Sequence, residues 1–364
     1  MKFSNFLFPQ SDTPDTDHEV VTDALREAEL TEELGFDGVW LGEHHIDGAC
    51  AYVDPVTFAA AVSARTERVK IGFAAVQMAL HHPIRLAEQI ALLDNISKGR
   101  IILGVGRGTA YNFYEYRSYG IPFAEAQGRL VESEEILPKA WTTENYRHKS
   151  EFFDIDLPVL RPKVYQSPHP PIIRAVATEG SMIEMAKQGR PLMLVVQPDD
   201  ETERRFGVYW RTLTESGLDE EDVEQVMADC WIWRNIYVAD TDAEAEKLAA
   251  RVHEANRAHI TETRLRLNTT EEMSSVKVGL ADPRFNGETS VIFGSPDTVA
   301  ERIERLERIG VGGLILHFRV GPMTWDQNER SLRMFADEVM PRFKTPSRPM
   351  GERRGEGGEG ETSA

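Results

Sequence analysis

The chain has 364 residues, of which 41% are hydrophobic and 28% charged, and its formal net charge is -19. This length suits one (β/α)8 barrel with insertions, and the composition is that of a globular protein with a large core. The acidic balance argues against nucleic acid or an anionic membrane as a partner, because both attract basic surfaces.

Two cysteines, Cys50 and Cys230, are too few for a disulfide framework and are typical of a reducing cytoplasm. The N-terminus begins directly with a strand-like run and shows no signal-peptide pattern. No apolar run reaches the roughly 18 residues that a membrane span needs. We therefore expect a cytoplasmic enzyme.

Strand-like apolar runs alternate with helical patterns along the chain, which predicts a parallel sheet closed as a single (β/α)8 TIM barrel. Residues 1–344 are expected to form this domain, and the acidic, glycine-rich residues 345–364 a disordered tail. In chain order, the expected strands are Phe3–Phe8, Gly38–Leu41, Lys70–Ala74, Arg100–Val105, Ile172–Val176, Leu192–Val196, Ile232–Val238 and Gly313–Phe318.

Glycine and proline mark the expected helix ends. Pro83 stands in the first turn of a helical pattern that Gly99 ends. Ser295-Pro296 begins another pattern, which ends at Gly310. The positions of these residues support the division into strands and helices.

Three stretches do not fit a minimal barrel. Residues 111–121 and 142–171 are rich in aromatic residues and proline, and we expect them to form insertions over the C-terminal face of the barrel. Residues 265–289 have few periodic apolar positions, which is typical of a lid or a disordered segment.

An acid and two histidines follow the second expected strand. Glu43, His44 and His45 come where barrel enzymes carry catalytic groups. Neighbouring strand residues point to opposite faces, so one of the two histidines is expected to face the barrel mouth. A structural hydrogen-bonding role and a metal site are the alternatives, although the usual companions of a metal motif are missing.

Two turns have the composition of anion-binding loops. Gly106, Arg107 and Gly108 follow a strand, so the backbone can approach a ligand closely and Arg107 can bind a negative group. Thr178 to Ser181 begin a helix, where free N–H groups suit a phosphate. The alternatives are a surface ion pair for Arg107 and simple helix capping by Thr178 or Ser181.

Several segments in matching register resemble bacterial luciferase α subunits, and the chain is identified as a member of the luciferase-like flavin-dependent monooxygenases. The resemblance covers nearly everything before the tail, although it is weaker between residues 111 and 170 and between 250 and 294. The segments that carry it are Met1–Phe8, Glu43-His44-His45, Ala74-Ala75, Leu92–Arg100, Gly104–Gly108 and Phe335–Pro341.

The resemblance implies FMN, used as FMNH2, with O2 as co-substrate. It places Arg107 on the FMN phosphate and the Ala74-Ala75 bond, as a cis peptide, against the flavin ring. The cofactor-binding residues that it implies are Ala74, Ala75, Gly106, Arg107, Val176, Thr178, Glu179, Gly180 and Ser181.

His44 matches the family's catalytic histidine, and an imidazole can exchange a proton near neutral pH. Glu43 and His45 are expected to orient the site. Apolar walls of the substrate pocket are expected from Phe6, Phe8 and Tyr111.

Two residues depart from the luciferase pattern. Gly106 stands in place of a reactive cysteine, and Val196 in place of a tryptophan. Both changes argue against light emission and a long aldehyde substrate, while the cofactor residues are retained.

We therefore predict an FMNH2-dependent monooxygenase that transfers one oxygen atom from O2 to a small, largely apolar organic substrate. Reduced flavin would come from a separate NAD(P)H-dependent flavin reductase, because the chain has no convincing NAD(P)H fingerprint. The resemblance also implies a homodimer. The alternatives are a deazaflavin-dependent hydride-transfer oxidoreductase and a non-catalytic flavin-binding subunit, and retention of His44 and Arg107 argues against the latter.

Overall fold

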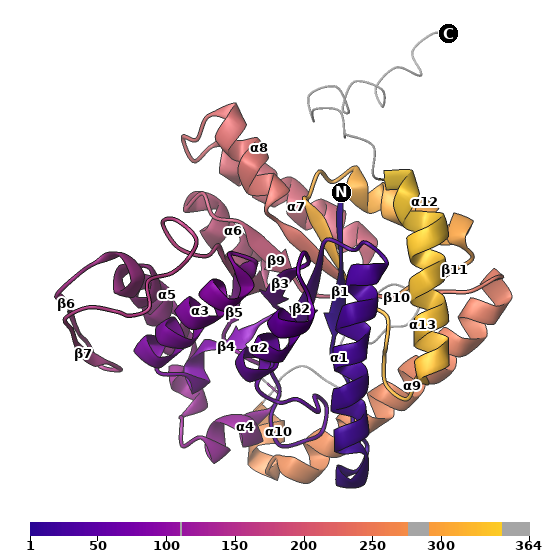
Figure 1. The fold of residues 1–364 in the computed structure, drawn as a ribbon, viewed down its shortest axis with the longest axis horizontal. Coiled ribbons are helices and arrows are strands. Elements are labelled where there is room, and N and C mark those ends of the chain that lie inside the picture. Colours follow the sequence, from indigo (N-terminus) through magenta and orange to yellow (C-terminus); the bar gives the residue numbers. More distant parts are fainter. Residues whose placement is uncertain (110, 276–290, 344–364) are drawn as a thin grey trace.

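The computed structural model describes residues 1–109, 111–275 and 291–343, whose parallel strands close into one barrel surrounded by helices (Figure 1). Each strand of the ring pairs with the next, and the last pairs with the first. The ring consists of β1 (Lys2–Leu7), β2 (Gly38–Leu41), β3 (Lys70–Phe73), β5 (Ile101–Gly106), β8 (Ile172–Val176), β9 (Leu192–Leu194), β10 (Trp231–Val238) and β12 (Gly313–His317). These are the expected strands, so the (β/α)8 prediction is confirmed.

Two further parallel strands lie beside the ring and were not predicted. β4 (Val76–Gln77) pairs with the end of β5, and β11 (Val291–Gly294) pairs with the end of β10. β4 has only two residues, too few for hydrophobic periodicity to reveal, and β11 directly follows a stretch with few periodic apolar positions.

Helices cover the outside of the ring. Pro83 and Pro296 begin α3 and α12 as expected, and Gly99 follows α3 with a φ of 80°. The longer helices are α1 (Asp17–Glu33), α2 (Pro55–Arg65), α3 (Pro83–Ser97), α5 (Ala126–Thr142), α6 (Glu179–Lys187), α7 (Asp199–Thr214), α8 (Glu220–Ala228), α9 (Asp242–Leu267), α12 (Pro296–Glu307) and α13 (Trp325–Met334). In the described part of the chain, no helix is long and apolar enough to cross a membrane.

Alternate side chains of the strands fill the barrel interior. Gly72 leaves space for the Trp40 ring, because a Cβ at Gly72 would lie 2.5 Å from it. Gly42 likewise faces inward, where a Cβ would meet the rings of Phe6 and Phe8. The buried interior cluster consists of Phe6, Trp40, Ile173, Met193, Trp231 and Ile315.

The expected insertions take different positions. Residues 111–121 contain α4 (Phe113–Ser118), which reaches the loop after β2 as expected. Residues 142–171 do not lie over the barrel mouth, so that prediction was wrong. Their antiparallel hairpin of β6 (Tyr146–Lys149) and β7 (Asp154–Leu157) buries its aromatic residues against α5, and Gln166 bonds the start of β5, opposite the mouth.

The expected lid is partly helical. Residues 265–267 end α9, and α10 (Thr270–Ser275) follows, so the prediction of a loop was wrong there. Polar bonds from Arg264 and Asn268 anchor this end of α9, which is why apolar periodicity did not reveal it. Residues 276–289 of the expected lid and the expected tail, 345–364, lie outside the described residues.

Replacing Gly72 by Ala should lower the free energy of unfolding by about 1 to 3 kcal/mol, because the added methyl overpacks the interior against Trp40. Gly207 of α7 has open space around it, so Gly207→Ala should raise stability by about 0.5 to 1 kcal/mol. Chemical denaturation of both variants checks this. If Gly72→Ala changed the free energy of unfolding as Gly207→Ala does, the interior would be shown to adapt freely to the methyl group.

Candidate active site

His44 lies at the mouth of the barrel, beyond the C-terminal end of β2. The centres of the His44 and Phe8 rings lie 5.5 Å apart in a T-shaped arrangement. Phe8 in turn stacks on the interior Phe6, with ring centres 5.4 Å apart. Glu43 and His45 turn to the other side and are buried. The structure thus brings one histidine to the mouth, as the alternation predicts, and identifies it as His44.

A buried glutamate that sequence reasoning missed holds His44 in place. His44 Nδ1 lies 2.8 Å from Oε1 of Glu115 on α4, and the same oxygen accepts the backbone N–H of His45 at 2.9 Å. Burial lowers the pKa of His44, but the Glu115 carboxylate outweighs it and leaves this pKa above its ordinary value. Because a carboxylate only accepts, Nδ1 carries the hydrogen and Nε2 remains for proton exchange.

Glu43 orients the loop after β2. Its Oε1 lies 2.8 Å from Nε2 of His45 and 2.8 Å from Nε2 of His81, and its Oε2 accepts the Gln77 N–H at 2.6 Å. Burial raises the pKa of Glu43, but the His81 and His45 imidazoles outweigh it and lower this pKa to about 2. Glu43 is therefore a buried anion bonded to β4 and to two imidazoles.

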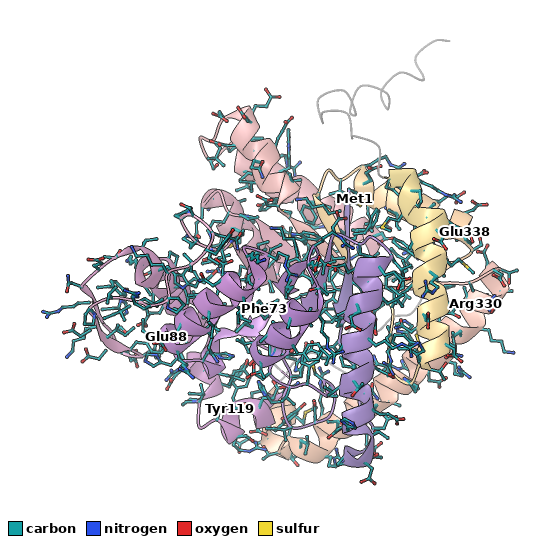
Figure 2. All side chains as sticks on the ribbon, in the orientation of Figure 1. Met1, Phe73, Glu88, Tyr119, Arg330 and Glu338 are labelled. Carbon is teal, nitrogen blue, oxygen red and sulfur yellow. The ribbon has the colours of Figure 1, made fainter. Side chains whose placement is uncertain are left out.

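Residue Tyr119, which follows α4, completes this arrangement from outside the barrel (Figure 2). Its hydroxyl lies 3.0 Å from Nδ1 of His45, whose other nitrogen bonds Glu43. Both ring nitrogens of His45 are thus occupied by the protein. This supports the expected orienting role of His45.

Small residues from three strands meet beside the histidine loop. A Cβ on Gly106 would lie 3.2 Å from Cβ of Ala75 and 3.7 Å from Cβ of Ala175. The Ala74-Ala75 peptide bond is cis, as the resemblance implies. Together these residues form a floor against which a flat ring can lie. Sequence reasoning missed Ala175, although alternation along β8 places it inward with Ile173.

Arg107 follows β5, and the loop of residues 177–181 follows the neighbouring strand β8. Val105 is in register with Arg174, so the residues that follow leave the sheet side by side. The Arg107 guanidinium lies 5.4 Å from the centre of the Phe123 ring. Within the described residues no carboxylate forms an ion pair with Arg107, which leaves its charge available for an anion.

The loop after β8 combines the two expected roles. Thr178 caps α6, because its Oγ1 accepts the Ser181 N–H at 3.3 Å, while Gly180 has open space around its Cα. Glu179, an awkward neighbour for a phosphate, forms an ion pair with Arg204 of α7. The side chain of Val176 is buried in the layer between sheet and helices, so only its main chain can face a ligand.

Uncharged aromatic groups line the interior next to His44. The Phe6 ring lies 5.0 Å from Trp233 and 5.3 Å from His317. Burial lowers the pKa of His317 to about 3, so this imidazole is neutral at physiological pH. Sequence reasoning missed both residues, although alternation along β10 and β12 places them inward. The Tyr111 ring lies 5.0 Å from the Arg264 guanidinium of α9.

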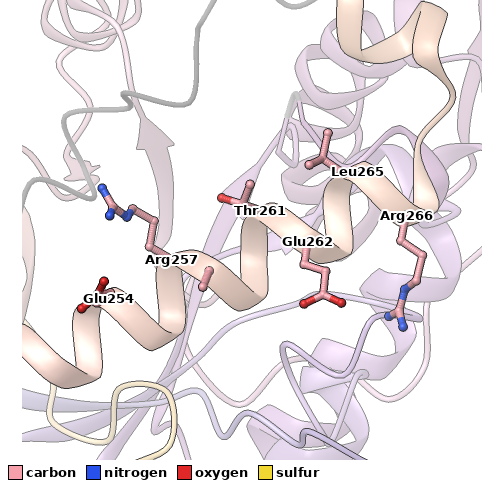
Figure 3. A pocket seen from close by; sticks show the side chains of 7 residues that line it. Glu254, Arg257, Thr261, Glu262, Leu265 and Arg266 are labelled. Atoms are coloured by element: carbon pink, nitrogen blue, oxygen red, sulfur yellow. The ribbon is translucent and has the colours of Figure 1, made fainter.

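An open groove of about 760 Å³ runs along α9 (Figure 3). Its lining residues are spaced by three and four positions and occupy the face opposite Ala245 and Val252, which pack against the barrel. The residues that line it are Glu254, Arg257, Ala258, Thr261, Glu262, Leu265 and Arg266.

Comparisons with known proteins agree with this geometry. The model of the luciferase-like monooxygenase family matches residues 1–313. The oxygenase component of flavin-dependent trigonelline monooxygenase from Acinetobacter baylyi is 26% identical over 362 residues, covering 94% of this chain and 96% of that protein. The solved monooxygenase RslO1 from Streptomyces bottropensis is 29% identical with a TM-score of 0.78, covering 94% of this chain and 100% of that one.

Two more distant solved structures share the fold. The oxygenating constituent of 3,6-diketocamphane monooxygenase from Pseudomonas putida, in complex with FMN, is 21% identical with a TM-score of 0.76 and covers 95% of this chain and 99% of that one. An F420-dependent secondary alcohol dehydrogenase is 18% identical with a TM-score of 0.71, and the match covers 93% of this chain and 98% of that one. At these identities the likeness concerns the fold alone.

Replacing Glu43 by Gln should lower the free energy of unfolding by about 3 to 5 kcal/mol, since it breaks a buried ion pair. The lowered pKa of Glu43 makes its stabilisation present above pH 4.5 and lost as pH falls through about 2. Burial lowers the pKa of His81, but Glu43 outweighs it and raises this pKa above its ordinary value of 6.5. The stabilisation that the charged His81 contributes is therefore fully present below pH 6.5 and is lost as pH rises through the raised pKa of the folded state. The cost should therefore be largest between pH 4.5 and 6.5.

Chemical denaturation across this pH range measures the cost. Glu29→Gln, which removes a half-exposed carboxylate on α1, is the control and should change stability little. A cost that does not vary with pH would show that the shape of Glu43, rather than its charge, is required.

Proposed function

This chain belongs to the luciferase-like monooxygenase family and is an enzyme of the flavin-dependent type, and we propose that it is an FMNH2-dependent monooxygenase acting on a small, largely apolar organic substrate. One observation carries the proposal. His44, held by the buried Glu115, faces the barrel mouth beside a floor formed by Gly106, Ala75 and Ala175.

The residues at the mouth fit FMN. The floor of small side chains suits a flat ring, and Arg107 with the start of α6 suits a phosphate, because a guanidinium and helix N–H groups bind anions. The trigonelline relative, which is named flavin-dependent, supports a flavin at this site. When bound, the reduced flavin supplies two electrons, so that one oxygen atom of O2 enters the substrate and the other leaves as water.

His44 handles the proton that this reaction requires. Its raised pKa lets Nε2 carry a proton near neutral pH, and Glu115 balances the resulting positive charge. Nε2 is therefore the atom that donates a proton to the departing oxygen and regains one from solvent.

The aromatic wall accounts for the substrate class. The rings of Phe6, Phe8 and Trp233 pack together, and the adjacent His317 is neutral. A charged substrate placed against this wall would lose hydration without gaining an opposite charge from these residues, which is costly. The wall therefore favours an uncharged, largely apolar compound.

Reduced flavin comes from a separate NAD(P)H-dependent reductase in this proposal. The sequence has no dinucleotide fingerprint, and the trigonelline relative is named an oxygenase component. A homodimer, which the family resemblance implies, completes the proposed assembly.

The decisive experiment supplies FMN, a flavin reductase, NADH and isotope-labelled O2 with a panel of aldehydes, ketones and terpenes. We expect a product that contains one labelled oxygen atom. Hydride transfer from reduced F420 without O2 would overturn the proposal in favour of a deazaflavin oxidoreductase. Flavin binding without any turnover on the panel would favour a non-catalytic subunit.

Replacing His44 by Ala should lower oxygenation by roughly 10²- to 10⁴-fold, the usual range for loss of an acid-base group. FMN binding should persist, because the residues proposed to bind phosphate are elsewhere. Product yield and flavin titration, measured on the same sample, separate the two effects. His148→Ala, which removes a histidine paired with Glu132 on the distant hairpin, should oxygenate normally. Normal oxygenation by folded, flavin-bound His44→Ala would make the catalytic assignment wrong.

Replacing Arg107 by Ala should weaken binding of reduced FMN by about 1.5 to 3 kcal/mol, the usual worth of a hydrogen bond to a charged group. Anaerobic calorimetry measures the affinity. Arg129 also lies over an aromatic ring but pairs with Glu125, so Arg129→Ala is the matched control and should bind normally. Unchanged affinity of Arg107→Ala would leave Arg107 with a structural role only.

A further inference from the structure

A chain of polar contacts connects α9 to His44. Arg264 of α9 donates from Nε to Oδ1 of Asn112 at 3.1 Å. The other end of this amide, Nδ2, lies 3.1 Å from Nδ1 of His44 and 3.4 Å from Oε1 of Glu115. Asn112 is only 3% exposed, so these protein groups largely replace water around its side chain.

The donor and acceptor chemistry allows one arrangement of these groups. A guanidinium only donates, so Arg264 must face the amide oxygen, and this turns the amide N–H groups of Asn112 toward Glu115. Glu115 only accepts, so it receives hydrogens from both His44 Nδ1 and Asn112 Nδ2. Arg264 thereby determines, through Asn112, which groups donate to Glu115.

Further bonds fasten the end of α9 to α4, the helix that carries Glu115. Asn268 donates to the Tyr111 carbonyl at 2.7 Å and accepts the Tyr114 N–H at 3.2 Å. Arg117 donates to the Leu267 carbonyl at 2.8 Å and forms an ion pair with Glu272. These bonds join the segment that carries Arg264 to the segment that carries Glu115, and they thus fix the position of Arg264 relative to Glu115.

Three charged groups face His44 from the surrounding segments. Glu115 of α4 and Asp47 of its own loop favour the imidazolium, and Arg264 of α9 opposes it. Asp47 is itself held by the Tyr114 hydroxyl. Arg264 is the cation in this set, so its removal should make His44 more basic.

We propose that Asn112 and Arg264 are positioning residues for His44, which hold the Glu115–His44 pair in place so that Nε2 is presented to the substrate. Arg264 also limits how basic the imidazole becomes, so the end of α9 tunes the group proposed to transfer the proton. The catalytic meaning of this inference rests on the proposed function. The contacts and their effect on His44 do not.

The test follows the imidazole nitrogen signals of His44 by NMR across a pH titration of the cofactor-free protein. Arg264→Leu removes both the charge and the donor, Arg264→Gln keeps a donor, and Arg264→Lys keeps the charge. We expect Arg264→Leu to raise the pKa of His44 by roughly 0.5 to 1 pH unit, as for loss of a cation in a partly buried site.

Arg264→Gln should raise the same pKa, and Arg264→Lys should stay closer to the unmodified chain in pKa. Asn112→Ala should also raise this pKa with Arg264 still present, because it removes an amide donor 3.1 Å from Nδ1. Arg266→Leu is the matched control, because it removes a cation from the groove face of the same helix (Figure 3) and should leave His44 unchanged.

A wild-type pKa of His44 in folded Arg264→Leu and Asn112→Ala would overturn the inference, and thermal melts establish folding. If Arg264→Leu does not fold, Arg264→Gln decides, because an unchanged pKa in that variant contradicts the proposed tuning. Loss of oxygenation is measured separately on flavin-loaded protein. A chain that shows these NMR changes but oxygenates nothing would refute the proposed function and leave the positioning role standing.

Discussion

The mouth of this barrel depends on keeping two buried carboxylates, Glu43 and Glu115, ionised. An unpaired buried carboxylate costs several kcal/mol, so each needs donors from the protein. Glu43 receives them from two imidazoles and the Gln77 main chain, and Glu115 from His44 and the His45 main chain. Gln77 joins the two groups, because its amide nitrogen also donates to Glu115 Oε2 at 3.1 Å.

This requirement explains why adjacent histidines take different roles. His45 is enclosed between Glu43 and Tyr119, so both of its nitrogens serve the structure. His44 gives one nitrogen to Glu115 and keeps the other for chemistry. A carboxylate that binds an imidazolium also makes that imidazole more basic. The same contact therefore holds the side chain and adjusts its proton affinity.

The size of the inward side chains decides where a ligand can lie. Deep in the barrel, Trp40 and Trp231 pack at 5.0 Å and fill the interior. Toward the C-terminal ends of β3, β5 and β8, the inward positions carry Ala75, Gly106 and Ala175. The inward side chains thus change from large to small along the strands. The neutral aromatic wall lies beside these small residues, which supports a flat cofactor and an apolar substrate together.

The sequence by itself determined the eight strands of the ring, because strands that are buried on both faces are marked by short apolar runs between turn residues. It also placed Glu43, His44 and His45 at a strand end, and the family resemblance supplied the cofactor. The hairpin of residues 142–171 was misplaced, since aromatic content shows that a segment is buried but not against which neighbour.

Only the tertiary structure decided which groups meet. Glu115 lies 71 positions from His44, Arg264 a further 149 beyond Glu115, and none of the local patterns connects them. Trp233, His317 and Ala175 face the mouth because strand alternation is anchored by the closed barrel. Local sequence records whether a residue prefers burial. The partner of a buried charge depends on how distant segments pack, and here that partner sets the basicity of His44.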